Sequence, residues 1–323
     1  MGFPINSETY SAIKHGIADS FYGTIIAEEQ EYTYNRLCKP IEQDDLTTTY
    51  TAWGGVPEPR AMSTALTGAT AAGGGRMAKQ LMDYKITGSV VEWEQTIEIP
   101  RSVVETQPGL AAEKAAEMAR KAMLYMERRF VGTILDAATL GYDGDALYST
   151  SHTESGASQD NADTSAAATG TKPTAAELET QLDLNVALVK AFTDDASTPV
   201  NATVKQFEMI VPLAFETLYN IVLGASNTAS PGLDVSGGTG RFKGMFNITA
   251  SPFVSAADRH FIFCKRPGYY AVALLKNKDW EVVDNINTDS DAWRLNQTAL
   301  IHSYARFEFI PWDWKGTIRQ VWT

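Results

Sequence analysis

The segment from residue 44 to residue 88 contains few large apolar side chains, although strand patterns bound it on both sides. Residues 47–53 have the composition of a β-strand. A stretch rich in Gly, Ala, Thr and Pro follows, with Gly73-Gly74-Gly75 inside it. Such a stretch buries too little surface to offset its own loss of conformational entropy. We therefore expect an extended arm that lies against another copy of the chain.

A long amphipathic helix is the strongest single element, and we expect it over residues 108–139. Pro108 stands at its entrance and no proline follows inside it. Its apolar stripe recurs at helical spacing and consists of Ala111, Ala115, Met118, Ala122, Met126, Phe130, Ile134 and Ala137. At this length the helix would measure roughly 45 Å, well above the usual helix of about 11 residues. A helix of this length predicts that it forms the elongated spine of its domain.

Two further elements are expected in the N-terminal half. Residues 6–22 predict a short helix whose stripe is Tyr10, Ile13, Ile17 and Phe21. That stripe needs a cover, either the body of its own chain or that of a neighbour. Residues 89–99 predict a strand, and from residue 91 apolar positions alternate with Glu and Thr. This alternation is typical of a strand with one buried and one solvated face.

The C-terminal half combines helices and strands. Residues 149–173 are almost all small or polar, so we expect an exposed, mobile loop or linker there. Thr174 with Glu177 predicts a capping box at the start of a helix. A buried strand is expected at 207–211, and Pro212 opens the next helix. Further strands are expected near 244–254, 259–265, 269–275, 298–310 and 317–322. This order of helices and strands predicts a small α/β or α+β unit.

The charge balance excludes a strong nucleic-acid binder. Lys and Arg number 27, Asp and Glu number 39, and the net charge is −12 with no basic run. A protein that neutralises phosphates needs a basic surface. The two cysteines are far apart, which favours a reducing compartment without disulfides. We expect neither a secretory signal nor a membrane span, because the longest apolar stretch covers only residues 269–275.

No motif predicts catalysis. The glycine-rich stretches at 73–76 and 237–241 lack the Lys-Ser or Lys-Thr of a phosphate loop. Asp143-Gly144-Asp145 lacks the remaining ligands of a calcium loop, so we expect a turn. His152 follows Ser149-Thr150-Ser151, but no nucleophile elbow is present. We therefore expect no enzyme activity and no catalytic, cofactor-binding or metal-binding residues.

A cluster of aromatic residues near the C-terminus has two open interpretations. Trp293, Trp312, Trp314 and Trp322 predict either core packing or part of a subunit interface, where Trp and Tyr are enriched. The candidate subunit-interface residues of the whole chain are Tyr10, Ile13, Ile17, Phe21, Trp53, Arg60, Arg76, Lys79, Trp312 and Trp314.

The order of these elements and three local motifs resemble a known family. The motifs are Tyr142-Asp143-Gly144-Asp145-Ala146-Leu147-Tyr148-Ser149-Thr150-Ser151-His152, the strand-Pro-helix segment 207–216, and the strand segment 243–252. They are similar to the Mu-like major head subunits (gpT-like) and their tailed-phage relatives. The likeness spans about residues 44 to 275, whereas the ending after Trp293 does not follow the family pattern.

The resemblance implies the Hong-Kong-97-type phage capsid fold, an α+β fold with named parts. These would be an N-terminal arm (1–43), an extended β-loop (44–90), a peripheral domain (91–173) with the spine helix 108–139, an axial domain (174–290), and return strands to the peripheral domain (291–323).

The resemblance also implies a function: a major capsid protein that self-assembles into an icosahedral shell around phage double-stranded DNA. Its partners would be further copies of itself in hexamers and pentamers, with decoration, scaffolding and portal proteins, and packaged DNA held without specific binding. It would be made in the host bacterial cytoplasm and reside in the virion capsid. Two alternatives stay open, an encapsulin-like nanocompartment shell protein and, from another class, a soluble hydrolase.

Overall fold

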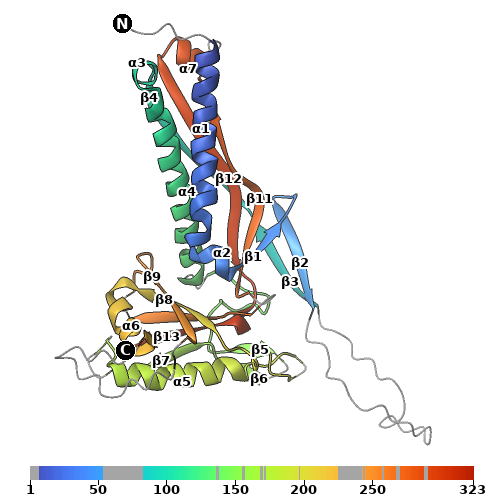
Figure 1. Ribbon diagram of the computed structural model, residues 1–323. Helices are drawn as coiled ribbons and strands as arrows, with labels where there is room; N and C mark the ends of the chain where they lie inside the picture. Colours follow the sequence, from blue (N-terminus) through green and yellow to red (C-terminus); the bar gives the residue numbers. More distant parts are fainter. Residues whose placement is uncertain are drawn as a thin grey trace, which may run out of the picture. The chain divides into compact units, whose positions relative to one another are not determined.

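The computed structural model describes residues 7–53, 83–135, 138–154, 157–167, 170, 172–195, 197–224, 242, 244–256, 258–266, 270–286 and 290–323. The chain forms two compact units. Unit 1 comprises residues 1–48, 88–136 and 272–311, and unit 2 comprises residues 49–87, 137–271 and 312–323. Each unit is therefore built from segments that lie far apart in the sequence (Figure 1).

Unit 1 combines two long helices with a four-stranded sheet. Its elements are α1 (Ser7–Glu28), η1 (Glu29–Glu31), α2 (Thr33–Leu37), β1 (Cys38–Glu42), β4 (Val91–Pro100), α3 (Arg101–Thr106), α4 (Pro108–Leu135), β11 (Val272–Asp284), α7 (Asp291–Arg294) and β12 (Thr298–Pro311). The strand order is β1-β11-β12-β4. β1 runs parallel to β11, and the other pairs are antiparallel.

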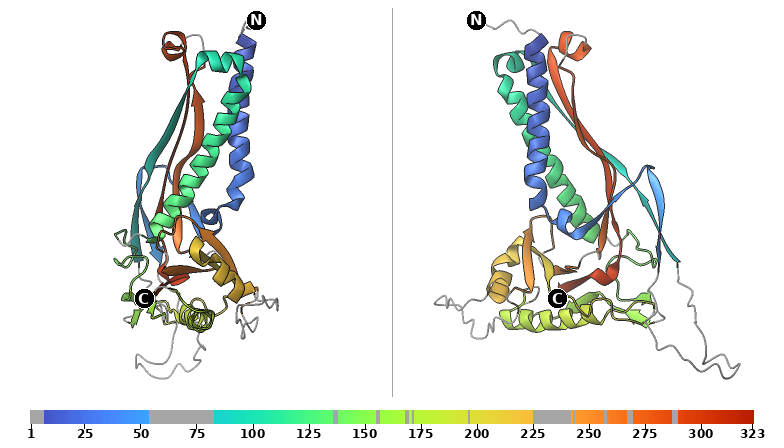
Figure 2. Two further views of the ribbon diagram at one scale, coloured as in Figure 1. Left: turned by 90° about the vertical axis from the view of Figure 1, so that its left-hand side faces the viewer. Right: turned by 45° about the vertical axis from the view of Figure 1, so that its right-hand side comes forward.

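Helices α1 and α4 lie side by side along one face of this sheet (Figure 2). The predicted stripe of α4 is buried from Ala111 to Ile134. Gly16 of α1 faces α4, and a Cβ there would lie 4.0 Å from the Cβ of Ala112, an ordinary van der Waals distance. α1 continues six residues beyond the predicted end, whereas α4 ends at Leu135, earlier than predicted. Ala137, the last residue of the predicted stripe, is outside the described residues.

Strand β12 carries the core of unit 1. Its burial alternates residue by residue, and the buried set that faces the helices is Ala299, Ile301, Ser303, Ala305, Phe307 and Phe309. The predicted strand at 89–99 is divided in the structure, because β3 (Asp83–Ser89) ends before β4 begins. Within β4 the predicted alternation is present, although Val91 is 41% exposed. Trp93 donates a hydrogen bond through Nε1 to the carbonyl of Phe307 at 3.1 Å.

Unit 2 holds a five-stranded sheet with helices. Its elements are β5 (His152–Glu154), β6 (Ala157–Gln159), β7 (Ala162–Ser165), α5 (Ala175–Ala191), β8 (Phe207–Pro212), η2 (Leu213–Phe215), α6 (Glu216–Gly224), β9 (Phe246–Ser251), β10 (Arg259–Cys264), η3 (Trp314–Gly316) and β13 (Thr317–Trp322). The order is β7-β13-β10-β8-β9, with β5 and β6 as a separate pair. β2 (Thr47–Trp53) pairs with β3 as another two-stranded sheet.

Several local signals of unit 2 are confirmed. Thr174 and Glu177 form the predicted capping box of α5, in which each side chain bonds the backbone of the other. β8 is buried along its whole length, as predicted for its core. Cys264 of this unit and Cys38 of unit 1 are both free and buried.

The prediction of an exposed, mobile loop at 149–173 is wrong for the described part of that segment. It contains β5, β6 and β7, and β7 pairs in parallel with β13 inside the larger sheet. His152 and Asn161 are both 0% exposed. Their burial is stable because hydrogen bonds satisfy their polar atoms, a condition that composition alone does not reveal.

The two units divide the chain at other residues than the predicted domains. Residues 137–173 and 312–323 group with unit 2, since β7 and β13 are neighbours in its sheet. Residues 272–290 group with unit 1, since β11 lies between β1 and β12. The labels of arm, loop, peripheral domain and axial domain stay predictions.

Candidate functional site

The predicted interface stripe of α1 is covered by the chain itself. Ile13, Ile17 and Phe21 are 7%, 1% and 0% exposed. Tyr10 is half-buried, and its ring meets that of Trp293 edge to face at 5.6 Å. Ile13, Ile17 and Phe21 belong to the core of unit 1, so assigning these three to a subunit interface is corrected, whereas the assignment of Tyr10 stays a prediction. Of the two alternatives for the stripe, the body of its own chain is the cover.

The remaining interface candidates are divided. Trp314 is 3% exposed and part of the core of unit 2, which corrects its assignment to an interface. Trp312 is half-buried and contacts Tyr50 of β2. The side chains of Trp53, Arg60, Arg76 and Lys79 lie outside the described residues.

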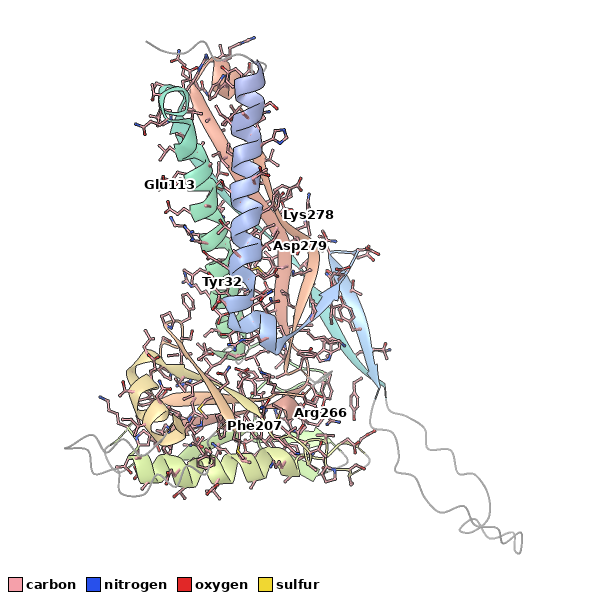
Figure 3. All side chains as sticks on the ribbon, in the orientation of Figure 1. Tyr32, Glu113, Phe207, Arg266, Lys278 and Asp279 are labelled. Atoms are coloured by element: carbon pink, nitrogen blue, oxygen red, sulfur yellow. The ribbon has the colours of Figure 1, made fainter. Side chains whose placement is uncertain are left out.

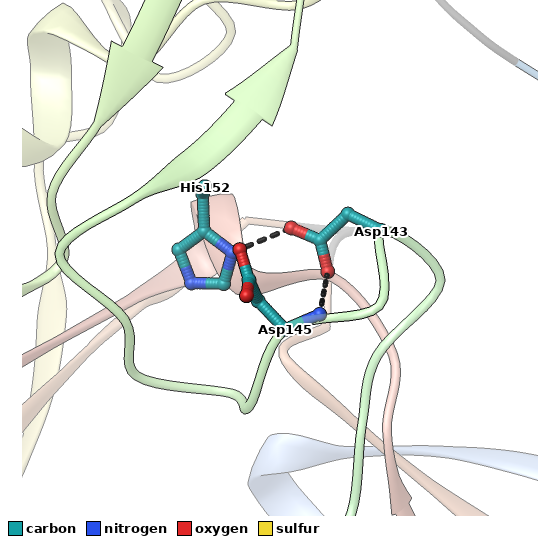
Figure 4. Close-up of side chains that lie close together, drawn as sticks. All are labelled: Asp143, Asp145 and His152. Atoms are coloured by element: carbon teal, nitrogen blue, oxygen red, sulfur yellow. Dashed lines mark hydrogen bonds and ion pairs between the residues drawn. The ribbon is translucent and has the colours of Figure 1, made fainter.

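A buried polar cluster lies where the sequence predicted a simple turn. The Asp143-Gly144-Asp145 segment does turn, with Gly144 at φ +85°, and the Gly141 N–H donates to the carbonyl of Asp145 at 2.7 Å. The turn brings the Asp143 carboxylate to Nδ1 of His152 at 2.5 Å (Figure 4). Both side chains are almost fully buried, at 3% and 1% exposure. The small and polar residues that follow His152 in the sequence predict a loop, so the sequence gives no sign that His152 is buried.

Asn161 fixes the other side of the imidazole ring. Its Nδ2 donates to the carbonyls of Leu147 at 2.8 Å and Trp314 at 3.2 Å, so its Oδ1 points the other way. That oxygen accepts from the Ser149 N–H at 3.0 Å and lies 3.2 Å from Nε2 of His152. Both ring nitrogens therefore lie within hydrogen-bond distance of oxygen atoms, Nδ1 close to that of Asp143 and Nε2 close to that of Asn161.

The ring of His152 also stacks on Trp314, with centroids 4.3 Å apart and planes 3° from parallel. The cluster thus ties a turn, a strand and the C-terminal segment together. Removing one member would leave buried polar atoms without a hydrogen-bond partner, which is destabilising.

The same cluster has the residue types of a cation site. Asp143, Asp145 and His152 each offer one donor atom, all within 4.8 Å of one another. However, Nδ1 of His152 is engaged with Asp143, and Nε2 faces Asn161. These hydrogen bonds hold the side chains of Asp143, His152 and Asn161 in one buried network.

Unit 1 contains a cavity of about 210 Å³ between α1, α4, β11 and β12. Its lining is mainly apolar and includes Tyr22, Ile25, Met123, Met126, Trp280 and Phe307. Lys278 and Asp279, labelled in Figure 3, stand beside it on β11. Their charges are paired along the same strand, Lys278 with Glu281 at 2.5 Å and Asp279 with Lys276 at 2.9 Å. This is an apolar recess and not an array of catalytic groups.

A second histidine is buried in unit 2. His260 is 0% exposed, and its Nδ1 lies 2.5 Å from the Tyr219 hydroxyl. Burial lowers the pKa of His260 to about 3, because a low-dielectric interior disfavours the charged ring. The same desolvation raises the pKa of Tyr219 above its ordinary value. His260 is therefore a neutral core residue.

None of the helices in the described part of the chain has the length and apolar character required to cross a bilayer.

Comparisons with known proteins agree with this architecture. The family described as the Mu-like prophage major head subunit gpT matches residues 71–184. The mature capsid of bacteriophage PhiM1 aligns with a TM-score of 0.57 and 11% identity, over 90% of this chain and 87% of that one. The capsid of an empty GTA particle aligns with a TM-score of 0.58 and 10% identity, over 90% of both chains.

The procapsid of bacteriophage JBD30 aligns with a TM-score of 0.54 and 13% identity, over 98% of this chain and 76% of that one. In another JBD30 capsid structure this chain spans 64% of the length of the chain it matches. No curated protein sequence matches the chain.

These likenesses define the class: the chain has the fold of phage capsid proteins, the Hong-Kong-97-type α+β fold that was predicted. Within that class, the match over residues 71–184 confirms the predicted resemblance to the Mu-like major head subunits. The description of that family is of a head subunit, a structural component of the phage.

Proposed function

We propose that this chain is the major capsid protein of a tailed phage and that copies of it assemble into a closed icosahedral shell. The observation that carries the proposal is the family match at residues 71–184 together with the capsid fold of the described residues. Hexamers and pentamers of identical subunits would form such a shell, because closed symmetric assemblies repeat the same contacts many times.

We further propose that the shell encloses double-stranded DNA without binding it specifically. The net charge of −12 supports this, because an acidic wall does not hold phosphates at close range. Decoration, scaffolding and portal proteins are proposed partners, and the host bacterial cytoplasm is the proposed place of synthesis. We assign the name of peripheral domain to unit 1, which holds the long helix α4, and that of axial domain to unit 2.

Electron microscopy of particles made by the expressed protein tests the proposal, followed by nuclease treatment and analysis of what the particles contain. Closed particles from phage-infected cells with nuclease-protected DNA are expected. Closed particles that hold a cargo enzyme and no DNA would favour the encapsulin-like alternative. A monomer with hydrolytic activity would replace both proposals.

Purified subunits are expected to bind DNA negligibly at physiological salt. Tight binding that weakens steeply as the salt concentration rises would contradict the proposal that the shell encloses DNA without holding its phosphates.

A further inference from the structure

We propose that Tyr142 and Trp312 are positioning residues that hold residues 49–53 of β2 and 83–87 of β3, the parts of these strands that belong to unit 2, in one direction on that unit, and that the buried network around His152 keeps both rings in place. The residues concerned are all described, and the contacts all lie within unit 2.

The first contact joins β2 to the C-terminal segment. The ring of Tyr50 meets the ring of Trp312 edge to face, with centroids 5.9 Å apart and planes at 70°. Tyr50 is half-buried, whereas Thr49 and Thr51 on either side of it are exposed, so Tyr50 is on the covered face of the strand. The N–H of Trp312 donates to the carbonyl of Ala271 at 2.8 Å, which fixes the backbone that presents the ring.

The second contact joins β3 to the turn that follows α4. The rings of Tyr84 and Tyr142 have centroids 4.9 Å apart. Lys315 donates a hydrogen bond to the Tyr142 hydroxyl at 2.6 Å, and its ammonium lies 5.0 Å from the centre of the same ring. Because the Lys315 side chain is only 7% exposed, this cation–π contact is largely desolvated.

One network holds both rings. Trp312 and Lys315 belong to a single short segment, and Lys315 also pairs with Asp313 at 3.2 Å. Tyr142 precedes Asp143 in the sequence, and Asp143 bonds His152, whose ring stacks on Trp314 of that C-terminal segment. The buried contacts of this network therefore fix the Tyr142 ring relative to the Trp312 ring.

The strand pair needs these two ring contacts for its stability. An isolated two-stranded sheet is marginally stable in water. The outward face of this pair carries hydroxyl groups that bond across the strands, as Thr49 and Thr87 do at 3.0 Å. The apolar contribution comes from the opposite face, where Ile86 is 5% exposed and Tyr50 and Tyr84 find their partners. Removing the rings should therefore make the orientation of the strands variable while unit 2 stays folded.

The consequence for assembly rests on the proposed function. If the orientation of the strand pair is already fixed before assembly, the pair loses less conformational entropy on binding a neighbouring subunit than a pair of variable orientation would lose. The positioning itself can be measured on single subunits, independently of shell formation.

The experiment places spin labels at Thr51→Cys and Leu184→Cys of the unassembled full chain and measures the distance distribution by pulsed electron resonance. Leu184 of α5 is 57% exposed, and the natural cysteines Cys38 and Cys264 are buried, so labelling is selective. The wild-type background is expected to give one narrow distribution. Tyr142→Leu and Trp312→Leu should broaden it. A broad wild-type distribution, or unchanged width in both variants, would overturn the proposal.

Two further variants keep the test valid if those substitutions disturb the core. Tyr50→Leu and Tyr84→Leu change only the strand side of each contact and should broaden the distribution in the same way. Amide exchange in β2 and β3 should rise about 2- to 10-fold for the loss of one aromatic pair, while exchange in β8 and β10 stays unchanged. A matched control, Tyr22→Leu in unit 1, should affect neither measurement. Unchanged width and exchange with Tyr50→Leu and Tyr84→Leu would refute the positioning role, and absence of shells from wild-type protein would instead refute the proposed function.

Discussion

Acid should destabilise the chain through His260, the neutral histidine beside Tyr219 and Trp322. Its pKa is about 3 in the folded state, against 6.5 for an ordinary histidine. The unfolded chain therefore takes up a proton first as the pH falls. The contribution of His260 is fully present above pH 6.5 and is lost progressively as the pH falls from 6.5 towards 3. Each unit of pH in that window costs at most about 1.4 kcal/mol.

Between pH 7 and pH 5 this amounts to a loss of about 2 kcal/mol in the free energy of unfolding. Urea unfolding of the unassembled subunit at both pH values measures it. His260→Gln, which can still accept a hydrogen bond from Tyr219, should lack this part of the loss. The difference between wild type and variant in this loss of unfolding free energy isolates His260, because the titration of all other groups contributes equally to both proteins. If wild type and variant lose the same stability between pH 7 and 5, the assignment of His260 as a neutral core histidine is wrong.

Two further substitutions test the packing and the helix start. Gly88→Ala should lower the free energy of unfolding by about 1–3 kcal/mol, because the new Cβ would overlap Leu275 Cδ1 and lie 3.3 Å from Ile310 Cδ1. Thermal unfolding measures this loss. The control Gly23→Ala, with open space around its Cβ, should be neutral or stabilising. Thr174→Ala should cost about 1 kcal/mol through loss of the capping box; a result no larger than that of Thr180→Ala on the exposed helix face would contradict the cap.

Local signals in the sequence were sufficient for the long elements. Helix α5 was predicted at its first residue because Thr174 and Glu177 satisfy each other within one turn. Helix α4 was predicted because Ala115, Met118 and Ala122 recur at helical spacing, and each of them is buried. These signals depend on neighbours within a few residues, which a single sequence displays directly.

The buried network was missed because its partners are distant in sequence. Asn161 bonds the carbonyl of Trp314, 153 residues away, and His152 stacks on the same tryptophan. A run of small polar residues predicts an exposed loop, unless tertiary partners satisfy its polar atoms. The Ser-x-x-His sequence ending at His152 was the only local signal.

Periodicity also does not say which chain covers a stripe. Ile17 and Phe21 form a clear apolar face on α1, and their spacing fits burial within the subunit as well as burial between subunits. Only the fold decides, by bringing α4 against that face and leaving Gly16 facing Ala112.

The mass of the purified protein in solution tests the central claim most directly. Mass photometry over a range of concentrations should show species of five or six times the 35.3 kDa subunit, or closed particles far larger. A single species at the subunit mass would contradict the assignment of this chain as a shell-forming capsid protein, if it is seen under every condition. These conditions include those that prevail when infected cells accumulate phage heads.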